Sequence, residues 1–571
     1  MSEIFDKLLI RMIFTLYICA SYFVFKYAHV LFYPSHRQQI LKNLTPSLNY
    51  INTLTFFGRV LGVGIIYSAL EFNEYIGMAF STIHFFIWST IGISTYLITL
   101  FITDWVIFQK QNFIDEVQKK KNSAYGLISF TNAIGVAFIL KQLFLVSQYS
   151  IIKYAILWLI TVIAYGASTR LYKFYSPNSF SKLMIQKNGS LAFGYTGFIL
   201  CHSLILASSL TESPILITDY LFNVLMRIGI GFILIPVFLF LFRKLFLHNT
   251  FDHPVKTKLD DFDHGIYEFL IFIFTGLFIS HLLHFVNLNL NFKLVALAIL
   301  FFAFIYKNLH VFFFPSPRAK FFSLRFKPVN TADLIHIFSR FIGLIIVYSK
   351  AYTINSPTEF AIWAAIGFVL YLLSILITEN IIFFNFNYHD EIFKNPNYAY
   401  IMVNFINAIC QGFLISKILE SAESSLMNLV VFWLQSLVIY GVSTRLFKYI
   451  SPLSFNSLMI QKNIGLAIAY SGFLLGNTVI MMSSYTQENY DLTDFLIQVL
   501  LKVNLSVLIL PLFYYGLSYV FRITIKPDHS NNDNTIHLGQ GIYGFSIYLL
   551  GAFLTSIIIT QIHFGTIYPF F

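Results

Sequence analysis

The sequence is a succession of long apolar runs, and this feature limits the fold more than any other. A transmembrane helix needs about 20 mainly apolar residues to cross about 30 Å of hydrocarbon. By this rule the 571 residues predict about 16 spans. The runs are continuous, whereas the strands of outer-membrane barrels are about 10 residues long and alternate between apolar and polar residues. We therefore expect an all-α polytopic membrane protein.

The predicted spans are residues 9–33, 50–70, 85–108, 124–146, 151–172, 189–210, 219–245, 266–286, 294–314, 330–351, 360–384, 399–419, 427–449, 464–484, 494–520 and 541–561. The composition agrees, because only 11% of the residues are charged against about 25% in a soluble globular domain. This excludes a soluble multidomain protein and a disordered chain. The first apolar run has no small-residue cleavage site, so we take it as a span and not as a signal peptide.

The basic residues predict the orientation of the chain in the membrane. The net charge is +11, and roughly 25 of the 37 Lys and Arg residues fall in loops within helical hairpins, against about 5 between hairpins. Because basic loops are retained in the cytoplasm, we expect the loops within hairpins on that side and both termini outside. Scattered loop charges do not form the basic face that nucleic-acid binding needs, so we expect the lipid bilayer as partner and no nucleic acid.

The chain is a tandem duplication of two halves, residues 1–286 and 287–571. The segment that starts STRLYKFYSPNSF at Ser168 recurs as STRLFKYISPLSF at Ser443, and Asn132 matches Asn407 in the same register. Each half divides into four helical hairpins, so the chain uses about eight hairpins. An even number of spans in each repeat predicts parallel repeats, related by an axis along the membrane normal.

A recurring motif marks the entry to the second span of several hairpins. It consists of a proline exit, a short loop ending in a basic residue, an Asn-x-small-x-small sequence, and a Gly-rich span. The matching positions are Asn463, Gly465, Ala467, Gly472 and Gly476, and in the first half Asn188, Ser190, Ala192 and Gly197. Weaker copies contain Asn122 and Asn397, and the hairpins that open each half lack the Asn-small-small entry.

In these hairpins the sequence resembles the YjfL-like family of small bacterial inner-membrane proteins, which is domain of unknown function 350. Members of that family typically have about two hairpins, so this chain looks like a fused array of several units. The resemblance implies a polytopic inner-membrane protein, sometimes associated with envelope-stress gene neighbourhoods, without an established activity.

Small residues form stripes along two of the predicted spans. Ser190, Gly194, Gly197 and Cys201 lie on one helix face, and their counterparts are Gly465, Ala469, Gly472 and Gly476. Such a face lets a neighbouring backbone approach closely, so we expect helix packing. The alternative is close contact with a permeating solute.

Ionisable residues inside spans are costly in hydrocarbon and are therefore candidates for function. Lys26 and His29 share one helix face, and Arg59 follows in the returning helix of the same hairpin; Lys307, His310 and Arg340 repeat the trio. Each trio predicts a binding site for a small anion or an anionic lipid head group. The alternative is that the basic side chains extend along their alkyl stems to the cytoplasmic interface.

Two carboxylates occupy equivalent positions, Asp104 in the first half and Glu379 in the second. Either could carry protons or balance a basic trio, and the alternative is that it reaches interfacial water. Asp252 and His253 match Asp528 and His529 in loops, but their spacing fits no metal-ligand motif. No catalytic or nucleotide-binding motif is present, so we expect no enzyme, no cofactor and no metal.

The sequence leaves two functions open. The first is a channel or transporter for a small anion or another small solute at the interface of the two halves, with the trios and the two carboxylates as contacts. The second is a non-catalytic membrane scaffold or envelope-stress component whose basic cytoplasmic loops recruit a soluble partner.

Overall fold

The computed structural model describes residues 2–33, 46, 49–70, 78–108, 111, 114–147, 150–172, 180, 184, 186–210, 217–245, 262–283, 290–313, 330–348, 357–422, 425–450, 455–485, 492–521 and 537–560. Within these ranges the chain forms 16 long helices and no strands. All 16 predicted spans are confirmed as helices. In the same ranges, 14 helices are long and apolar enough to cross a membrane, which supports a multi-pass membrane protein.

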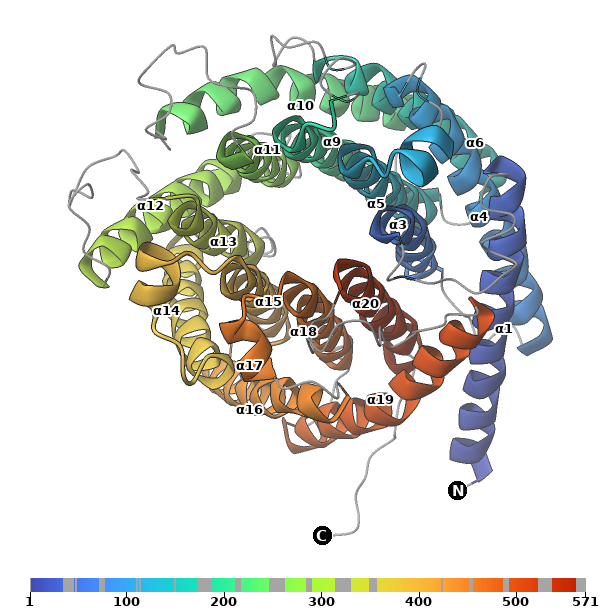
Figure 1. Ribbon diagram of the computed structural model, residues 1–571. Helices are drawn as coiled ribbons and strands as arrows, with labels where there is room; N and C mark the ends of the chain where they lie inside the picture. The colour runs from blue at the N-terminus through green and yellow to red at the C-terminus, as the bar shows by residue number, and fades with distance from the viewer. Residues whose placement is uncertain are drawn as a thin grey trace.

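The helices pair as eight hairpins, and each hairpin places its two helices in different layers (Figure 1). The first helices form the outer layer: α1 (Ser2–Phe32), α4 (Met78–Phe108), α6 (Ile151–Thr169), α10 (Ile217–Leu245), α12 (Leu290–Phe313), α14 (Pro357–Ile382), α16 (Leu426–Ile450) and α19 (Leu492–Val520). The second helices form the inner layer: α3 (Tyr50–Tyr67), α5 (Ser123–Ser147), α9 (Gly189–Ser209), α11 (Phe262–Leu283), α13 (Thr331–Val347), α15 (Tyr398–Ser421), α18 (Ile464–Ser484) and α20 (Leu538–Thr560).

The inner helices form a closed ring. Each one packs against the next in chain order, and α20 packs against α3 to complete the circle (Figure 1). The spans of the seven inner helices other than α13 are 67–89% buried inside the protein, whereas those of the seven outer helices other than α1 are 28–50% buried. The outer helices therefore present apolar side chains to lipid, and the inner helices make most of the protein contacts.

Short elements lie in the loops within hairpins, where the sequence predicted only loops. They are the π-helical turns η3 (Ile114–Lys119) and η6 (Asp390–Lys394) and the helix α17 (Phe455–Ile460). Because the two helices of a hairpin are antiparallel, these within-hairpin loops share one end of the ring.

Glycines let neighbouring inner helices approach to backbone contact. A Cβ added at Gly197 of α9 would lie 2.7 Å from the Cα and carbonyl oxygen of Phe269 in α11. A Cβ added at Gly412 of α15 would lie 2.8 Å from the carbonyl oxygen of Gly343 in α13. The small-residue stripe of α9 therefore faces α11, and the equivalent stripe of α18 faces α20, where Gly472 lies against Phe545. These stripes contact helices and not the centre of the ring.

The middle of the inner-ring face that points to the centre is apolar, whereas Lys141 of α5 and Glu420 of α15 lie on the same strips nearer the helix ends. Each inner helix has a ring neighbour on both sides and an outer helix behind it, so its remaining partly exposed residues face inward. In α5 this strip contains Leu127, Ile134 and Phe138, and in α15 it contains the equivalent Met402, Ile409 and Phe413. Further apolar residues along the middle of this face are Phe193, Leu200 and Leu204 of α9, Ile273 and Leu277 of α11, Ile468, Leu475 and Val479 of α18, and Leu549 and Phe553 of α20.

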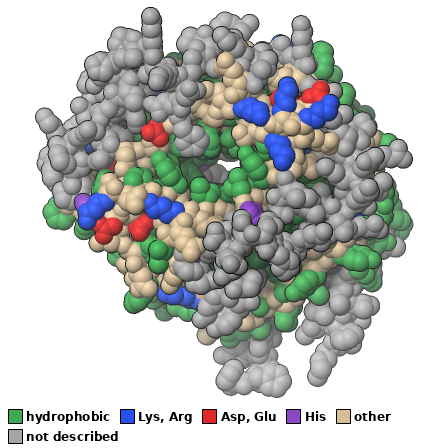
Figure 2. Space-filling model, viewed as in Figure 1, with side chains coloured by type: hydrophobic (Ala, Val, Ile, Leu, Met, Phe, Trp, Pro, Cys, Tyr) green, Lys and Arg blue, Asp and Glu red, His purple; other side chains and the backbone are tan. Residues whose placement is uncertain are grey.

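A closed ring of eight helices cannot fill its own centre. With helix axes 8–10 Å apart, a regular ring leaves an opening of about 10 Å once the radius of the helices is subtracted. Figure 2 shows a hollow at the centre of the face viewed, bordered by hydrophobic side chains. We call this central space the lumen, lined by the residues named above.

The contact between α9 and α11 predicts that replacing Gly197 with Leu strongly destabilises the protein. The new side chain meets backbone atoms of Phe269 that cannot move aside, and overpacking of this kind costs about 1–3 kcal/mol. Gly166 of α6 is the matched control, because a Cβ there meets no atom within 4 Å. In thermal unfolding in detergent, Gly166→Leu should unfold like the wild type and Gly197→Leu at a lower temperature. Equal unfolding temperatures for the two variants would contradict the close approach.

Candidate functional site

Arg59 is the centre of a buried polar cluster in the first half. Its side chain is 1% exposed, and it lies on α3 between the outer helices α1 and α4. One terminal nitrogen donates to Oδ2 of Asp104 at 3.1 Å, and the other contacts Nε2 of His29 at 3.0 Å. The hydroxyl of Tyr33 donates to the same carboxylate oxygen at 2.9 Å, and the Tyr33 ring lies 3.7 Å below the guanidinium. The cluster therefore ties two outer helices to one inner helix.

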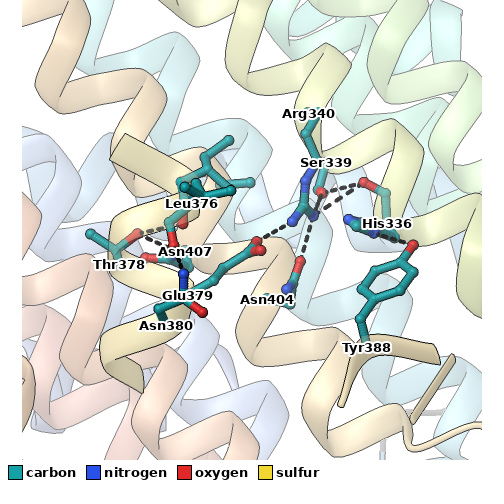
Figure 3. Close-up of polar contacts among 12 residues, drawn as sticks. His336, Ser339, Arg340, Leu376, Thr378, Glu379, Asn380, Tyr388, Asn404 and Asn407 are labelled. Atoms are coloured by element: carbon teal, nitrogen blue, oxygen red, sulfur yellow. Dashed lines mark hydrogen bonds and ion pairs between the residues drawn. The ribbon is translucent and has the colours of Figure 1, made fainter. Parts of the chain in front are cut away.

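Arg340 occupies the equivalent place in the second half, on α13 (Figure 3). Its guanidinium donates to the carboxylate of Glu379 on α14 and to the side-chain oxygen of Asn404 on α15. It also donates to the hydroxyl of Ser339 at 2.7 Å. Both arginines thus pair with a carboxylate from the next outer helix, but the other partners differ between the halves.

Two asparagines on inner helices lie beside the carboxylates. The Asn132 amide nitrogen donates to Oδ1 of Asp104 at 2.9 Å. The Tyr165 hydroxyl donates to the side-chain oxygen of Asn132 at 3.1 Å. In the second half, Asn407 donates to the hydroxyl of Thr378 at 2.9 Å and accepts from Tyr440. The sequence identified the two asparagines only as matching positions. The feature that could have indicated their role was an amide side chain within an apolar run.

The ion pairs explain how arginines can lie within the bilayer. An isolated charge in hydrocarbon is costly, whereas a pair with satisfied hydrogen bonds has no net charge to solvate. Arg59 and Arg340 are both fully buried, so neither extends to the membrane interface along its alkyl stem. That alternative interpretation of the trios was wrong for the arginines, because carboxylates on neighbouring helices satisfy their charge internally.

The basic trio of the first half is divided between two places in the structure. His29 contacts Arg59, but Lys26 donates to the backbone oxygen of Val520 at 2.8 Å, at the end of α19. This bond crosses the junction where the last hairpin meets the first. In the second half Lys307 and His310 are also buried, and Nε2 of His310 lies 3.1 Å from Oδ1 of Asp333.

The asparagine of the entry motif caps its own helix and binds the next hairpin. The Asn122 oxygen accepts from the backbone nitrogen of Ala124, and its amide donates to Oε2 of Glu116 and to the carbonyl of Met184. Asn397 makes the corresponding three contacts in the second half. Asn188 and Asn463 cap α9 and α18. An asparagine suits this position because its oxygen accepts from the helix start while its nitrogen donates elsewhere.

The hairpins that open each half use the same device, although they lack the small residues of the motif. Asn49 caps α3 and donates to the carbonyl of Val117 at 3.2 Å. Asn330 caps α13 and donates to the carbonyl of Ile392 at 2.7 Å. The sequence motif does not include these two residues, because it requires the small residues as well as the asparagine.

The described residues contain no group of three or more His, Cys, Asp or Glu side chains that could hold a metal ion. Asp252, His253, Asp528 and His529 lie outside the described residues.

The Arg59–Asp104 pair predicts a specific order of stabilities. Asp104→Leu leaves the Arg59 charge buried without its partner, which costs about 3–5 kcal/mol. The double variant Arg59→Met/Asp104→Leu removes both charges and should be more stable than Asp104→Leu alone by at least about 1 kcal/mol. The measurement is unfolding of the purified protein by denaturant in detergent micelles.

The control for this experiment is the exposed pair of Lys119 and Asp115, whose side chains are 74% and 42% exposed. Lys119→Gln should change stability by less than about 0.5 kcal/mol, because exposed pairs contribute little. A double variant no more stable than Asp104→Leu would show that the buried charge is not the main cost.

The comparisons with known proteins identify a family for nearly the whole chain. The profile of the family described as Domain of Unknown Function (DUF350) matches four times, over residues 4–144, 145–283, 286–419 and 421–559. Each match covers two hairpins, including those that open each half. No curated protein matches the chain, and no solved structure matches it. The chain therefore belongs to the DUF350 family, as an array of four copies of its domain.

Proposed function

We propose that this protein is a channel or transporter for a small solute, and that the solute passes through the lumen of the inner ring. The observation that carries the proposal is the closure of eight inner helices around an apolar hollow. A bundle that served only as an anchor would have no need to enclose a central space. We place the protein in the bacterial inner membrane with both termini outside, and we propose no enzymatic activity.

The lining of the lumen favours an uncharged solute over an anion. The lumen-facing residues along the middle of the ring are Leu, Ile, Val, Met and Phe, and apolar constrictions exclude ions because water leaves them. An anion that bound at Arg59 or Arg340 would have to compete with the carboxylate already paired there. Under this proposal the buried polar residues stabilise the contacts between the helices that surround the lumen. These residues are Lys26, His29, Arg59, Asp104 and their second-half equivalents.

A flux experiment with paired lumen variants tests the route. Wild-type proteoliposomes should take up glycerol faster than empty liposomes and should pass little chloride. Replacing Ile134 and its equivalent Ile409 with Asn lets water into the lumen, so chloride flux should rise at least about tenfold. The measurements are liposome swelling in glycerol and chloride efflux.

The matched control is Ile163→Asn with Val438→Asn. These residues occupy equivalent places on the outer helices α6 and α16, where they are 63% and 66% exposed to lipid. The control should keep the wild-type chloride flux. Equal chloride flux in the lumen and control variants would remove the lumen as the route, and wild-type glycerol uptake equal to that of empty liposomes would remove the transport proposal.

A scaffold that recruits a soluble partner is the second candidate, and one surface feature favours it. Figure 2 shows two groups of Lys and Arg side chains on the face viewed. Exposed basic residues with acidic partners include Lys119 and Lys120 near η3 and Lys394 in η6. A hydrogen bond from Lys119 holds the pKa of the Asp115 carboxyl below its usual range. Cross-linking from Lys394 should then capture one specific protein, and Lys394→Glu should abolish that capture.

A further inference from the structure

The lumen contains a basic side chain that the protein leaves without a partner. Lys141 of α5 follows Ile134 and Phe138 on the lumen-facing strip of that helix, and it is partly buried. In the part of the chain that the structure describes, Lys141 forms no hydrogen bond and no ion pair. Arg59 and Arg340, by contrast, are each paired with a carboxylate. Because an unpaired charge is costly inside a membrane protein, we expect the partner of Lys141 to come from outside the chain.

The second half does not repeat this unpaired charge. The register that pairs Asn132 with Asn407 places Ser416 at the position equivalent to Lys141, and Ser416 is buried. The basic residue near this place is Lys417, whose Nζ lies 3.1 Å from Oε2 of Glu420. The helices α5 and α15 are opposite one another in the ring of eight. The lumen therefore has an unbalanced cation on one side and a balanced pair on the other.

Lys141 lies near the end of the lumen that is remote from the within-hairpin loops. The helix α5 begins at Ser123, on the loop side, and Lys141 is less than two turns from its last residue, Ser147. From Leu127 to Lys141 the strip rises about 21 Å, at about 1.5 Å per residue. The strip thus combines a long apolar stretch with one cation at its far end.

This combination matches the chemistry of a long-chain carboxylic acid. The hydrocarbon core of a bilayer is about 30 Å thick and contains two layers of acyl chains, so one chain spans about 15 Å. A chain of that length fits along the strip between Lys141 and Leu127. The carboxylate would accept charge-assisted hydrogen bonds from the ammonium group of Lys141. The chain would cover apolar side chains that are otherwise left facing an open lumen.

Other anionic ligands match the lumen less well. A small anion would balance the charge of Lys141 but would leave the apolar strip uncovered. A phospholipid would bring two chains into a hollow that Phe138, Phe413 and Phe553 all face. One cation and a hollow narrowed by aromatic rings therefore favour a ligand with one charge and one chain.

We propose that the lumen binds a single-chain carboxylic acid, with the carboxylate at Lys141 and the chain along the apolar strips of α5 and α15. The ligand lies in the route that we propose for the solute, so the bound acid blocks glycerol uptake. That blocking rests on the proposed function, whereas the binding of the acid does not.

The test is photolabelling of the full-length protein in phosphatidylcholine nanodiscs. The probe is hexadecanoic acid with a diazirine in the middle of its chain, and mass spectrometry identifies the labelled residues. Specific labelling is the part that excess unlabelled hexadecanoic acid removes. We expect it at lumen-facing residues such as Ile134 and Ile409, and not at the lipid-facing Ile163 and Val438. A lumen without specific labelling would overturn the proposal.

Variants at Lys141 test the contact with the carboxylate. Lys141→Gln should lower specific labelling at least about tenfold, because the charged partner of the carboxylate is lost, and Lys141→Arg should retain it. Because Lys141 has no partner among the described residues, its replacement leaves none of them unsatisfied, and we expect the variant to fold. The matched control is Lys153→Gln, at the start of the outer helix α6 and the same end of the ring, where Nζ lies 5.1 Å from the Tyr220 ring centroid. Equal labelling of the Lys141→Gln and Lys153→Gln variants would overturn the assignment of Lys141.

Two competitors separate the charge from the chain. Hexadecanol has the chain without the charge, and inorganic phosphate has the charge without the chain. Neither should displace the probe at a concentration at which hexadecanoic acid does. Equal displacement by phosphate would indicate a site for small anions, equal displacement by hexadecanol would indicate a site for the chain alone, and either result would overturn the proposal. Labelling needs no solute gradient, so it can fail while glycerol uptake is normal, and glycerol uptake can fail while labelling succeeds.

Discussion

The structure depends on one requirement, that polar groups inside a membrane find partners within the protein. Arg59 and Arg340 could not remain buried as isolated charges, and each is paired with a carboxylate from the neighbouring outer helix. The pairs lie between the inner and outer layers, where neither lipid nor the lumen needs to solvate them. This arrangement leaves apolar side chains on both the outside of the protein and the lining of the lumen.

The same requirement applies to the ends of the helices. The first backbone N–H groups of a helix have no partner within it. The motif asparagines supply one, and with the remaining amide several of them bind the loop of the next hairpin. One residue type therefore both begins the inner helix and fixes its neighbour in the ring. The contact recurs at four places in the ring, at Asn49, Asn122, Asn330 and Asn397, and each time it joins a hairpin to the next one in chain order.

Duplication gives the two halves one architecture but not one chemistry. The lumen-facing residues of the two halves correspond closely, as Ile134 does to Ile409. The polar positions have diverged, since α13 has Asp333 and His336 at the positions where α3 has Asn52 and Thr55. Equivalent packing contacts allow the repeats to form one ring. Different polar residues at equivalent positions allow each half to contribute different chemical groups.

The sequence by itself determined the number of helices, their approximate ends, the hairpins and the correspondence of the halves. These properties are local, because span length follows from bilayer thickness and the turns from the proline and asparagine positions. The layer of each helix, the closure of α20 on α3 and the choice of Asp104 as the partner of Arg59 came only from the tertiary structure. A lumen and an ion pair between two helices depend on how the helices are rotated against each other. That rotation is decided by glycine contacts and side-chain packing across the whole ring, which no single segment encodes.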